Sequence, residues 1–170
     1  MICFDICNTL AAVNPLVIAR FGGDRHRMLP IPEDFWASAE GLAIFRDAEP
    51  LAHAAQAVNR LAAVYGGVTY VTSRPERSEL VTRSWLNRHG FPKGEVIFCS
   101  REEKIRVHLE KKPSLVAEDD PLVVKGLMSL GVPILVYQWG YNEGIRGDRI
   151  IPVRNWKNFG SLGGEIYGAV

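Results

Sequence analysis

The feature that most constrains the fold is an alternation of short apolar segments with segments of helical length. The apolar segments carry the β-branched and aromatic residues typical of strands. We expect strands at 1–5, 68–72, 95–99, 114–117, 133–137 and 149–153. We expect helices at 51–65, 76–89, 101–111 and 122–130, and a closing helical turn at 155–159. Such βαβ units predict an α/β fold, with a three-layer Rossmann-like, mostly parallel sheet that has helices on both faces.

Residues 10–48 interrupt this alternation. They contain a polar, basic loop, a turn at Pro30–Pro32, and a short helical pattern around Phe35, Trp36, Leu42 and Phe45. A length of 170 residues suits one domain with a small insertion. We therefore expect a single domain over residues 1–170 and a small cap at 10–48, inserted after the first strand.

Composition and charge argue against several classes of protein. The formal net charge of +1 gives no reason to expect binding of extended nucleic acid or of a membrane surface. No apolar run approaches the roughly 20 residues of a membrane helix, and no basic segment precedes an apolar one as in a signal peptide. Cys3, Cys7 and Cys99 give neither a disulfide framework nor a complete zinc site. Together these features predict a cytoplasmic protein with reduced thiols.

Polar residues follow four of the predicted strands. They are Asp5 after the first strand, Thr72, Ser73 and Arg74 after the second, Lys104 one turn after the third, and Glu118 and Asp119 after the fourth. Ligands of such sheets bind beyond the carboxyl ends of the strands. A carboxylate nucleophile, an acidic pair that binds Mg²⁺, a hydroxyl and an ammonium are the groups that phosphoryl transfer requires.

Each of these residues could also serve a purely structural purpose. Asp5 and Thr72 are suited to capping a helix. Lys104 lies among charged residues, as on a solvated helix face, and acidic residues such as Glu118 and Asp119 are favourable near a helix N-terminus. Structural purposes alone do not explain why polar residues of these four kinds follow four successive strands.

The motifs that carry these residues resemble those of the haloacid dehalogenase-like hydrolase superfamily. The motifs are FDICNTL, VTYVTSRP, SREEKIRVHL and LVAEDDP. Two further runs, WLNRHGF and YNEGIRGDRIIPVRNW, are similar to the 5′(3′)-deoxyribonucleotidase group of that superfamily, also called C-type 5′-nucleotidases. The resemblance covers nearly the whole chain except residues 12–43.

The resemblance implies a role for each motif residue. Asp5 would be the nucleophile and a Mg²⁺ ligand, together with the backbone carbonyl of Cys7 and a carboxylate of either Glu118 or Asp119. The phosphoryl group would be bound by Thr72, Ser73, Arg74 and Lys104. The implied activity is Mg²⁺-dependent hydrolysis of a phosphomonoester through an aspartyl-phosphate. The implied substrate is a nucleoside monophosphate or a similar small phosphate.

Cys7 departs from the motif, which has a second aspartate at this position to protonate the leaving group. A thiol with a pKa near 8.5 is a poor substitute, and general acid–base catalysis contributes about 10² to 10⁴ in rate. His26 or Asp120 would be candidates to replace it. A branch that acts on phosphonates also lacks this aspartate but needs a cap lysine, and residues 10–48 contain no lysine. The alternative function is a phosphate-binding or regulatory domain with weakened catalysis.

The basic loop of the predicted cap is a candidate for substrate recognition. Arg25 and Arg27 could contact a phosphate or a nucleotide, and Phe21, Phe35 or Trp36 could stack on a base. The competing interpretation is a solvated loop above a small apolar core.

Overall fold

The computed structural model describes residues 1–24, 26–27 and 29–160. Within these residues six strands form one sheet, and every neighbouring pair is parallel. In chain order the strands are β1 (Ile2–Phe4), β2 (Val68–Thr72), β3 (Glu95–Phe98), β4 (Val116–Glu118), β5 (Ile134–Tyr137) and β6 (Ile150–Val153). All six correspond to predicted strands. The predicted α/β class and Rossmann-like sheet are confirmed.

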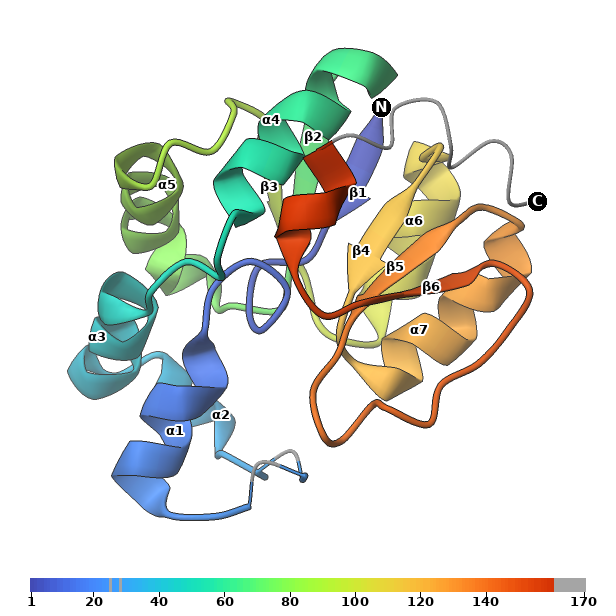
Figure 1. Ribbon diagram of the computed structural model, residues 1–170. Helices are drawn as coiled ribbons and strands as arrows, with labels where there is room; N and C mark the ends of the chain where they lie inside the picture. The colour runs from blue at the N-terminus through green and yellow to red at the C-terminus, as the bar shows by residue number, and fades with distance from the viewer. Residues whose placement is uncertain (25, 28, 161–170) are drawn as a thin grey trace.

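Helices cover both faces of this sheet (Figure 1). The main ones are α4 (Ala54–Tyr65), α5 (Glu79–Arg88), α6 (Glu103–Lys111) and α7 (Pro121–Leu127). Short 3₁₀ turns lie at Glu76–Ser78, Met128–Leu130 and Trp156–Gly160. Each predicted helix is present with its ends shifted by a few residues. Among the described residues no helix combines the length and the apolar character needed to cross a bilayer.

The sheet is buried on both sides because its strands are apolar on both faces. Along β1, Ile2 and Phe4 contribute to a core shared with α4 and α5, whereas Cys3 contributes to a core shared with α6 and α7. All three residues of β1 are fully buried. This is the pattern of a central strand in a parallel sheet.

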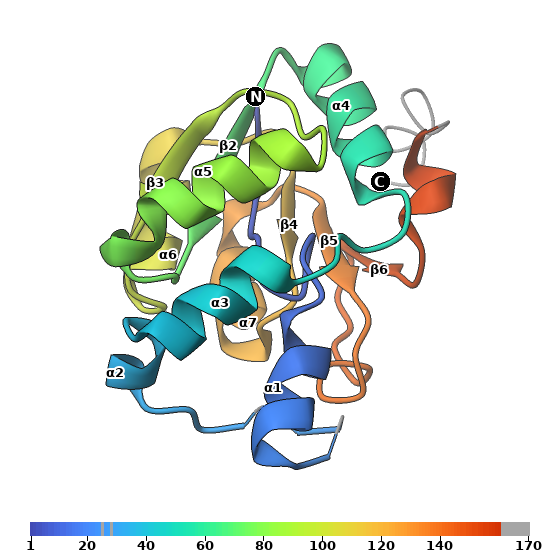
Figure 2. The ribbon, with the colours of Figure 1, turned by 90° about the vertical axis from the view of Figure 1, so that its left-hand side faces the viewer.

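Residues 10–48 contain the helices α1 (Val13–Phe21), α2 (Glu33–Trp36) and α3 (Ala39–Asp47). Figures 1 and 2 show them beyond the end of the sheet at which β1 ends. The sequence predicted helical structure around 35–45 but not α1. Of α1 only Val13 and Val17 are buried, so its apolar periodicity is weak. The role of this segment as a cap stays a prediction.

The strand order β3-β2-β1-β4-β5-β6 defines the position of the site. The order reverses between β1 and β4, which pair through Cys3 with Val116 and Phe4 with Ala117. At such a reversal the loops after the two strands diverge and leave a crevice. Asp5 immediately follows β1 and Asp119 immediately follows β4, so the chain delivers carboxylates to this crevice from both strands.

Candidate functional site

Three carboxylates meet at the ends of β1 and β4. Asp5, Glu118 and Asp119 each offer an oxygen, and these oxygens lie within 4.8 Å of one another. All three residues are buried. We refer to Asp5, Glu118 and Asp119 as the carboxylate cluster. The structure therefore brings together the acidic residues that the strand order predicted to converge.

Lys104, in the first turn of α6, lies against this cluster. Its Nζ donates hydrogen bonds to Asp5 Oδ1 at 2.6 Å and to Glu118 Oε2 at 2.9 Å. Burial opposes its charge, but attraction to the two carboxylates outweighs burial and raises the pKa of the ammonium. The side chain is 3% exposed, so the interpretation of Lys104 as part of a solvated helix face is wrong.

The cluster sets three buried acidic groups against the Lys104 ammonium. Burial raises the pKa of Glu118 to about 7, although Lys104 opposes this change and Asp5 reinforces it. Burial also raises the pKa of Asp119 well above its usual value, and the neighbouring carboxylates add to the effect. A site of this kind favours a bound cation, because a cation would relieve the repulsion between the carboxylates.

This electrostatic arrangement predicts a pH-dependent stability. A carboxyl group whose pKa is raised by folding contributes stability below its usual pKa of about 4.5, and this contribution is lost as the pH rises through about 7. A metal ion binds the deprotonated form. We expect the increase in Tm caused by Mg²⁺, relative to EDTA, to grow between pH 5 and pH 8. A Mg²⁺ effect on Tm that is equal at both pH values would contradict this account of Glu118.

Asp119 is held by residues that the sequence did not single out individually. Thr9 Oγ1 donates a hydrogen bond to Asp119 Oδ1 at 3.1 Å, and the Tyr141 hydroxyl donates to Oδ2. Asn142 Nδ2 donates to the Asp119 carbonyl oxygen at 2.8 Å. The available signals were the runs FDICNTL and YNEGI, which contain these three residues. Asp119 is therefore oriented by the loop after β1 and by the loop between β5 and β6.

Asp5 differs from its neighbours in having one oxygen without a partner. Its Oδ2 is buried and accepts no hydrogen bond from the described residues. An unpaired buried carboxylate oxygen is unfavourable unless it binds something. The donor set of the cluster consists of hard oxygen ligands, which suits a divalent cation. The Oδ2 atom is thus available to a metal ion or to an electrophile.

Thr72 is the last residue of β2, on the other side of β1 from β4, and Ser73 and Arg74 follow it. Thr72 is buried, and its Oγ1 accepts a hydrogen bond from the Arg74 amide at 3.3 Å. Ser73 is exposed and lines a cavity, as does Arg74. Thr72 therefore shapes the turn that presents the next two residues.

Cys7 lies close to Arg74, whose Nε donates to Cys7 Sγ at 3.2 Å. Burial raises the pKa of the thiol, although the charge of Arg74 opposes this change. At neutral pH the side chain at the motif position is accordingly a protonated, weakly hydrogen-bonding thiol. Position 7 therefore lacks the carboxylic acid that the motif normally places there.

A cavity of about 770 Å³ opens next to the cluster. Its lining includes Cys7, Ser73, Arg74, Arg101 and Asp120 from the strand-end loops and adjoining turns. Residues 10–48 add mainly apolar side chains: Val13, Val17, Leu29, Ile31, Trp36 and Phe45. The cavity is therefore polar near the carboxylate cluster and largely apolar on the side of α1–α3.

The basic loop of the predicted cap does not bring Arg27 to the cavity. Arg27 is exposed and is not among the described residues that line the cavity. Arg25 lies outside the described residues. His26 packs against Gly140, where an added Cβ would lie 2.2 Å from the imidazole Nδ1. Of the cap residues proposed to recognise the substrate, Trp36 lines the cavity, whereas Arg27 contributes no cation to it.

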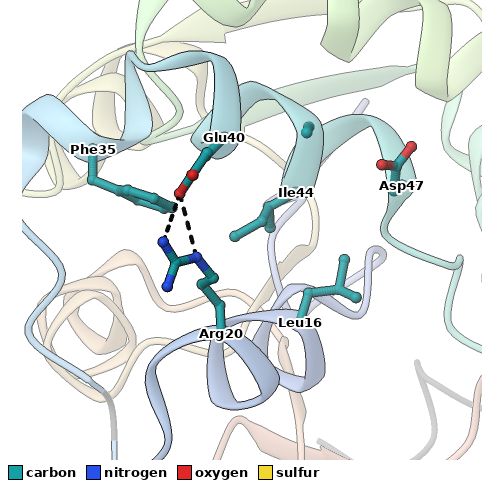
Figure 3. A pocket seen from close by; sticks show the side chains of 7 residues that line it. Leu16, Arg20, Phe35, Glu40, Ile44 and Asp47 are labelled. Atoms are coloured by element: carbon teal, nitrogen blue, oxygen red, sulfur yellow. Dashed lines mark hydrogen bonds and ion pairs between the residues drawn. The ribbon is translucent and has the colours of Figure 1, made fainter.

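A second, smaller cavity of about 260 Å³ lies between α1 and α3 (Figure 3). Its lining is mostly apolar, with Leu16, Phe35 and Ile44 among its side chains. Its charged side chains include Arg20 and Glu40, which form an exposed ion pair with 3.0 Å between Nη2 and Oε2. It offers no buried, unpaired polar group among the described residues, so we do not regard it as the functional site.

Known proteins resemble this chain in sequence and in fold. No protein-family model matches it. A Bacillus cereus protein named "Putative nucleotidase" is 29% identical over 132 residues, which cover 75% of this chain and 67% of that protein.

Solved structures show the same fold at low identity. A haloacid dehalogenase-like family hydrolase from Xanthomonas campestris has a TM-score of 0.63 and 14% identity, covering 99% of this chain and 94% of that one. The D,D-heptose 1,7-bisphosphate phosphatase from B. bronchiseptica, complexed with magnesium and phosphate, has a TM-score of 0.58 and 10% identity, covering 99% and 98%. The chain therefore shares the fold of hydrolases of the haloacid dehalogenase-like superfamily.

Proposed function

We propose that the protein is a Mg²⁺-dependent phosphomonoester hydrolase that acts through an aspartyl-phosphate. The observation that carries this proposal is the buried, unpartnered Oδ2 of Asp5, beside two further carboxylates and Lys104. A carboxylate oxygen held in this way is suited to nucleophilic attack on phosphorus. The names of the Bacillus cereus relative and of the heptose bisphosphate phosphatase add support for a small phosphate ester, such as a nucleoside monophosphate.

The residues of the carboxylate cluster fit a magnesium ion. Asp5, the backbone carbonyl of Cys7 and a carboxylate of Glu118 or Asp119 would hold it, because Mg²⁺ prefers oxygen ligands. When bound, Mg²⁺ would supply positive charge that reduces the repulsion between the Asp5 carboxylate and an incoming phosphate.

The chain's own groups perform the remaining steps. Asp5 Oδ2 would form a bond to phosphorus while the bond from phosphorus to the leaving-group oxygen breaks. Lys104 holds Asp5 Oδ1 in place and brings a positive charge close to the phosphoryl oxygens. Ser73, presented by the Thr72 turn, would donate to the phosphoryl group through its amide. Water would then cleave the acyl-phosphate and release inorganic phosphate, which regenerates Asp5.

Proton transfer to the leaving group is the weak step. Asp120 is poorly suited to supply the proton, since Oδ1 accepts from the Leu122 amide at 2.9 Å and Oδ2 from Arg101. Cys7 occupies the motif position of the missing acid, but a thiol donates weakly. We therefore expect slower turnover for esters whose leaving group is a poorly acidic alcohol than for aryl phosphates.

The test of the proposal is a hydrolysis screen with and without Mg²⁺. Nucleoside monophosphates, sugar phosphates and p-nitrophenyl phosphate should release phosphate in the presence of Mg²⁺, and EDTA should abolish the release. Saturable binding of phosphate without hydrolysis of any ester would instead support the alternative, a phosphate-binding or regulatory domain. Hydrolysis that is unaffected by EDTA would contradict the role of the metal.

Restoring the motif aspartate gives a further prediction. From general acid catalysis alone, Cys7→Asp would raise the rate with an alkyl phosphate at least roughly tenfold. Arg74 lies 3.2 Å from Cys7 Sγ, however, and a carboxylate there would pair with the guanidinium and have a lowered pKa. We therefore expect the tenfold gain with glycerol 3-phosphate in the Cys7→Asp/Arg74→Met double variant and a smaller gain in Cys7→Asp. Equal gains in both variants would contradict this coupling.

A further inference from the structure

Arg74 is a buried cation without an acidic partner. Arg74 is 3% exposed, and no carboxylate of the described residues forms an ion pair with its guanidinium. Lys104 is equally buried but contacts two carboxylates. Buried charges are normally paired, because removing them from water is unfavourable. The isolation of Arg74 therefore calls for a partner that the chain does not provide.

The guanidinium is nevertheless held firmly. Its Nη1 donates to Thr82 Oγ1 on α5 at 3.2 Å, and its Cζ lies over the ring of Phe45 from α3, 4.5 Å from the ring centroid. The ring of Trp85 lies 5.8 Å from the same group. A group fixed by two neighbouring elements loses little conformational freedom on binding a ligand. Arg74 is thus preorganised to bind.

One edge of the guanidinium remains to be satisfied. Nε and Nη2 share this edge, which matches the two oxygens of a carboxylate or phosphate. Nε donates to the sulfur of Cys7, which is a weak acceptor, and Nη2 is buried with no partner among the described residues. An aspartate at position 7 would place a carboxylate at this edge. Cys7 therefore leaves open a place for an anion.

This edge of the Arg74 guanidinium lies at the cavity of about 770 Å³ beside the carboxylate cluster. Cys7 and Arg74 both line it, and Cys7 follows the nucleophile Asp5 by two residues. A phosphoryl group at Asp5 would extend its leaving group into this cavity. We propose that Arg74 binds an anionic group, a carboxylate or a second phosphate, that the substrate carries on the leaving-group side of the scissile phosphoryl group. This inference rests on the proposed phosphatase function and narrows its substrate class.

Binding of the second anion by Arg74 can be distinguished by experiment from two alternatives. These are binding of that anion by Arg101 and a purely structural role of Arg74. Arg101 also lines the cavity, but it already pairs with Asp120. If Arg74 only tied α3 to α5, its replacement would affect all substrates equally. Matched substrates with and without a second anion therefore separate these three cases.

The experiment measures kcat/KM for two substrate pairs that differ mainly in the second anion. The pairs are 3-phosphoglycerate with glycerol 3-phosphate, and fructose 1,6-bisphosphate with fructose 6-phosphate. The wild-type protein should prefer the anionic member of at least one pair by roughly tenfold or more, and the preferred pair identifies the anion as carboxylate or phosphate. Arg74→Gln should lose this preference, because kcat/KM should fall more for the member with the second anion than for the member without it. Arg77→Gln, which removes an exposed charge outside the cavity lining, should retain the preference.

Three results would overturn the inference. They are the absence of a preference in the wild-type protein, its survival in Arg74→Gln, and its loss in Arg101→Gln instead. Failure of Arg74→Gln to fold, assessed by circular dichroism, would move the test to Arg74→Lys, which keeps the charge but lacks the two-nitrogen edge and should weaken the preference. Absence of hydrolysis with every substrate would overturn the proposed function; calorimetric binding of the same pairs would still decide the role of Arg74.

Discussion

Replacement of Asp5 by asparagine should reduce Mg²⁺-dependent hydrolysis of every phosphate ester by at least about 10³-fold, the scale of losing a catalytic nucleophile. An amide oxygen cannot form the acyl-phosphate, although it can still accept the hydrogen bond from Lys104 Nζ. Release of inorganic phosphate from p-nitrophenyl phosphate measures the effect. Rapid-quench trapping of a covalent phosphoprotein in the wild type, absent in Asp5→Asn, provides a second readout.

The matched control is Asp148→Asn, which changes an exposed aspartate outside both the carboxylate cluster and the cavity lining. It should retain full activity. The thermal unfolding of Asp5→Asn should remain cooperative, since the Lys104 ammonium keeps its contact with Glu118 at 2.9 Å. Substantial turnover by a folded Asp5→Asn protein would rule out Asp5 as the nucleophile.

The second large effect is expected for Lys104→Met. Methionine fills a similar volume but removes the cation that contacts Asp5 and Glu118. Three carboxylates with oxygens within 4.8 Å would then be left without it. Breaking a buried ion pair on one side destabilises a protein by about 3–5 kcal/mol, so we expect a loss of this order in the free energy of unfolding without metal. Activity should fall as well.

Magnesium provides the informative contrast for this variant. A divalent cation in the cluster would replace part of the lost positive charge, so Mg²⁺ should raise the Tm of Lys104→Met more than that of the wild type. Lys125→Met, which alters an exposed lysine on α7, should behave like the wild type in both conditions. A variant as stable as the wild type in EDTA would show that Lys104 does not balance the cluster.

Local sequence patterns were sufficient for most of the fold. The runs VTYVT and EVIFC predicted β2 and β3 because β-branched and aromatic residues favour strands. Gly66 ends α4 in the left-handed conformation, with a φ of 76°, directly after the predicted end of this helix at residue 65. By contrast, α1 was missed because the burial of one side of a helix depends on what packs against it. Val13 and Val17 alone give too little periodicity.

Within the site, the sequence predicted the strand-end residues but not their partners. The order of Asp5, Thr72, Lys104 and Glu118 along the chain was sufficient to predict that they converge, because parallel strands end at one edge. The charged neighbours of Lys104 also allowed a solvated position, and only the packing of α6 against the sheet decided in favour of burial. The anchoring of Asp119 by Tyr141 depends on a contact across 22 positions of the chain, which no local pattern encodes.

The arginines show most clearly what the sequence determined and what only the tertiary structure decided. By itself, the sequence determined the α/β class, the strand-end carboxylates and the loss of the second motif aspartate at Cys7. It offered Arg74 after the second strand, and Arg25 and Arg27 in the basic loop, as candidates for binding the substrate. Only the tertiary structure separated two of them: Arg27 is exposed, whereas Arg74 is buried at the cavity with its guanidinium against Cys7. The physical reason is that an arginine's surroundings are set by the elements that pack around it, here α3, α5 and the loop after β1, and not by its neighbours in sequence.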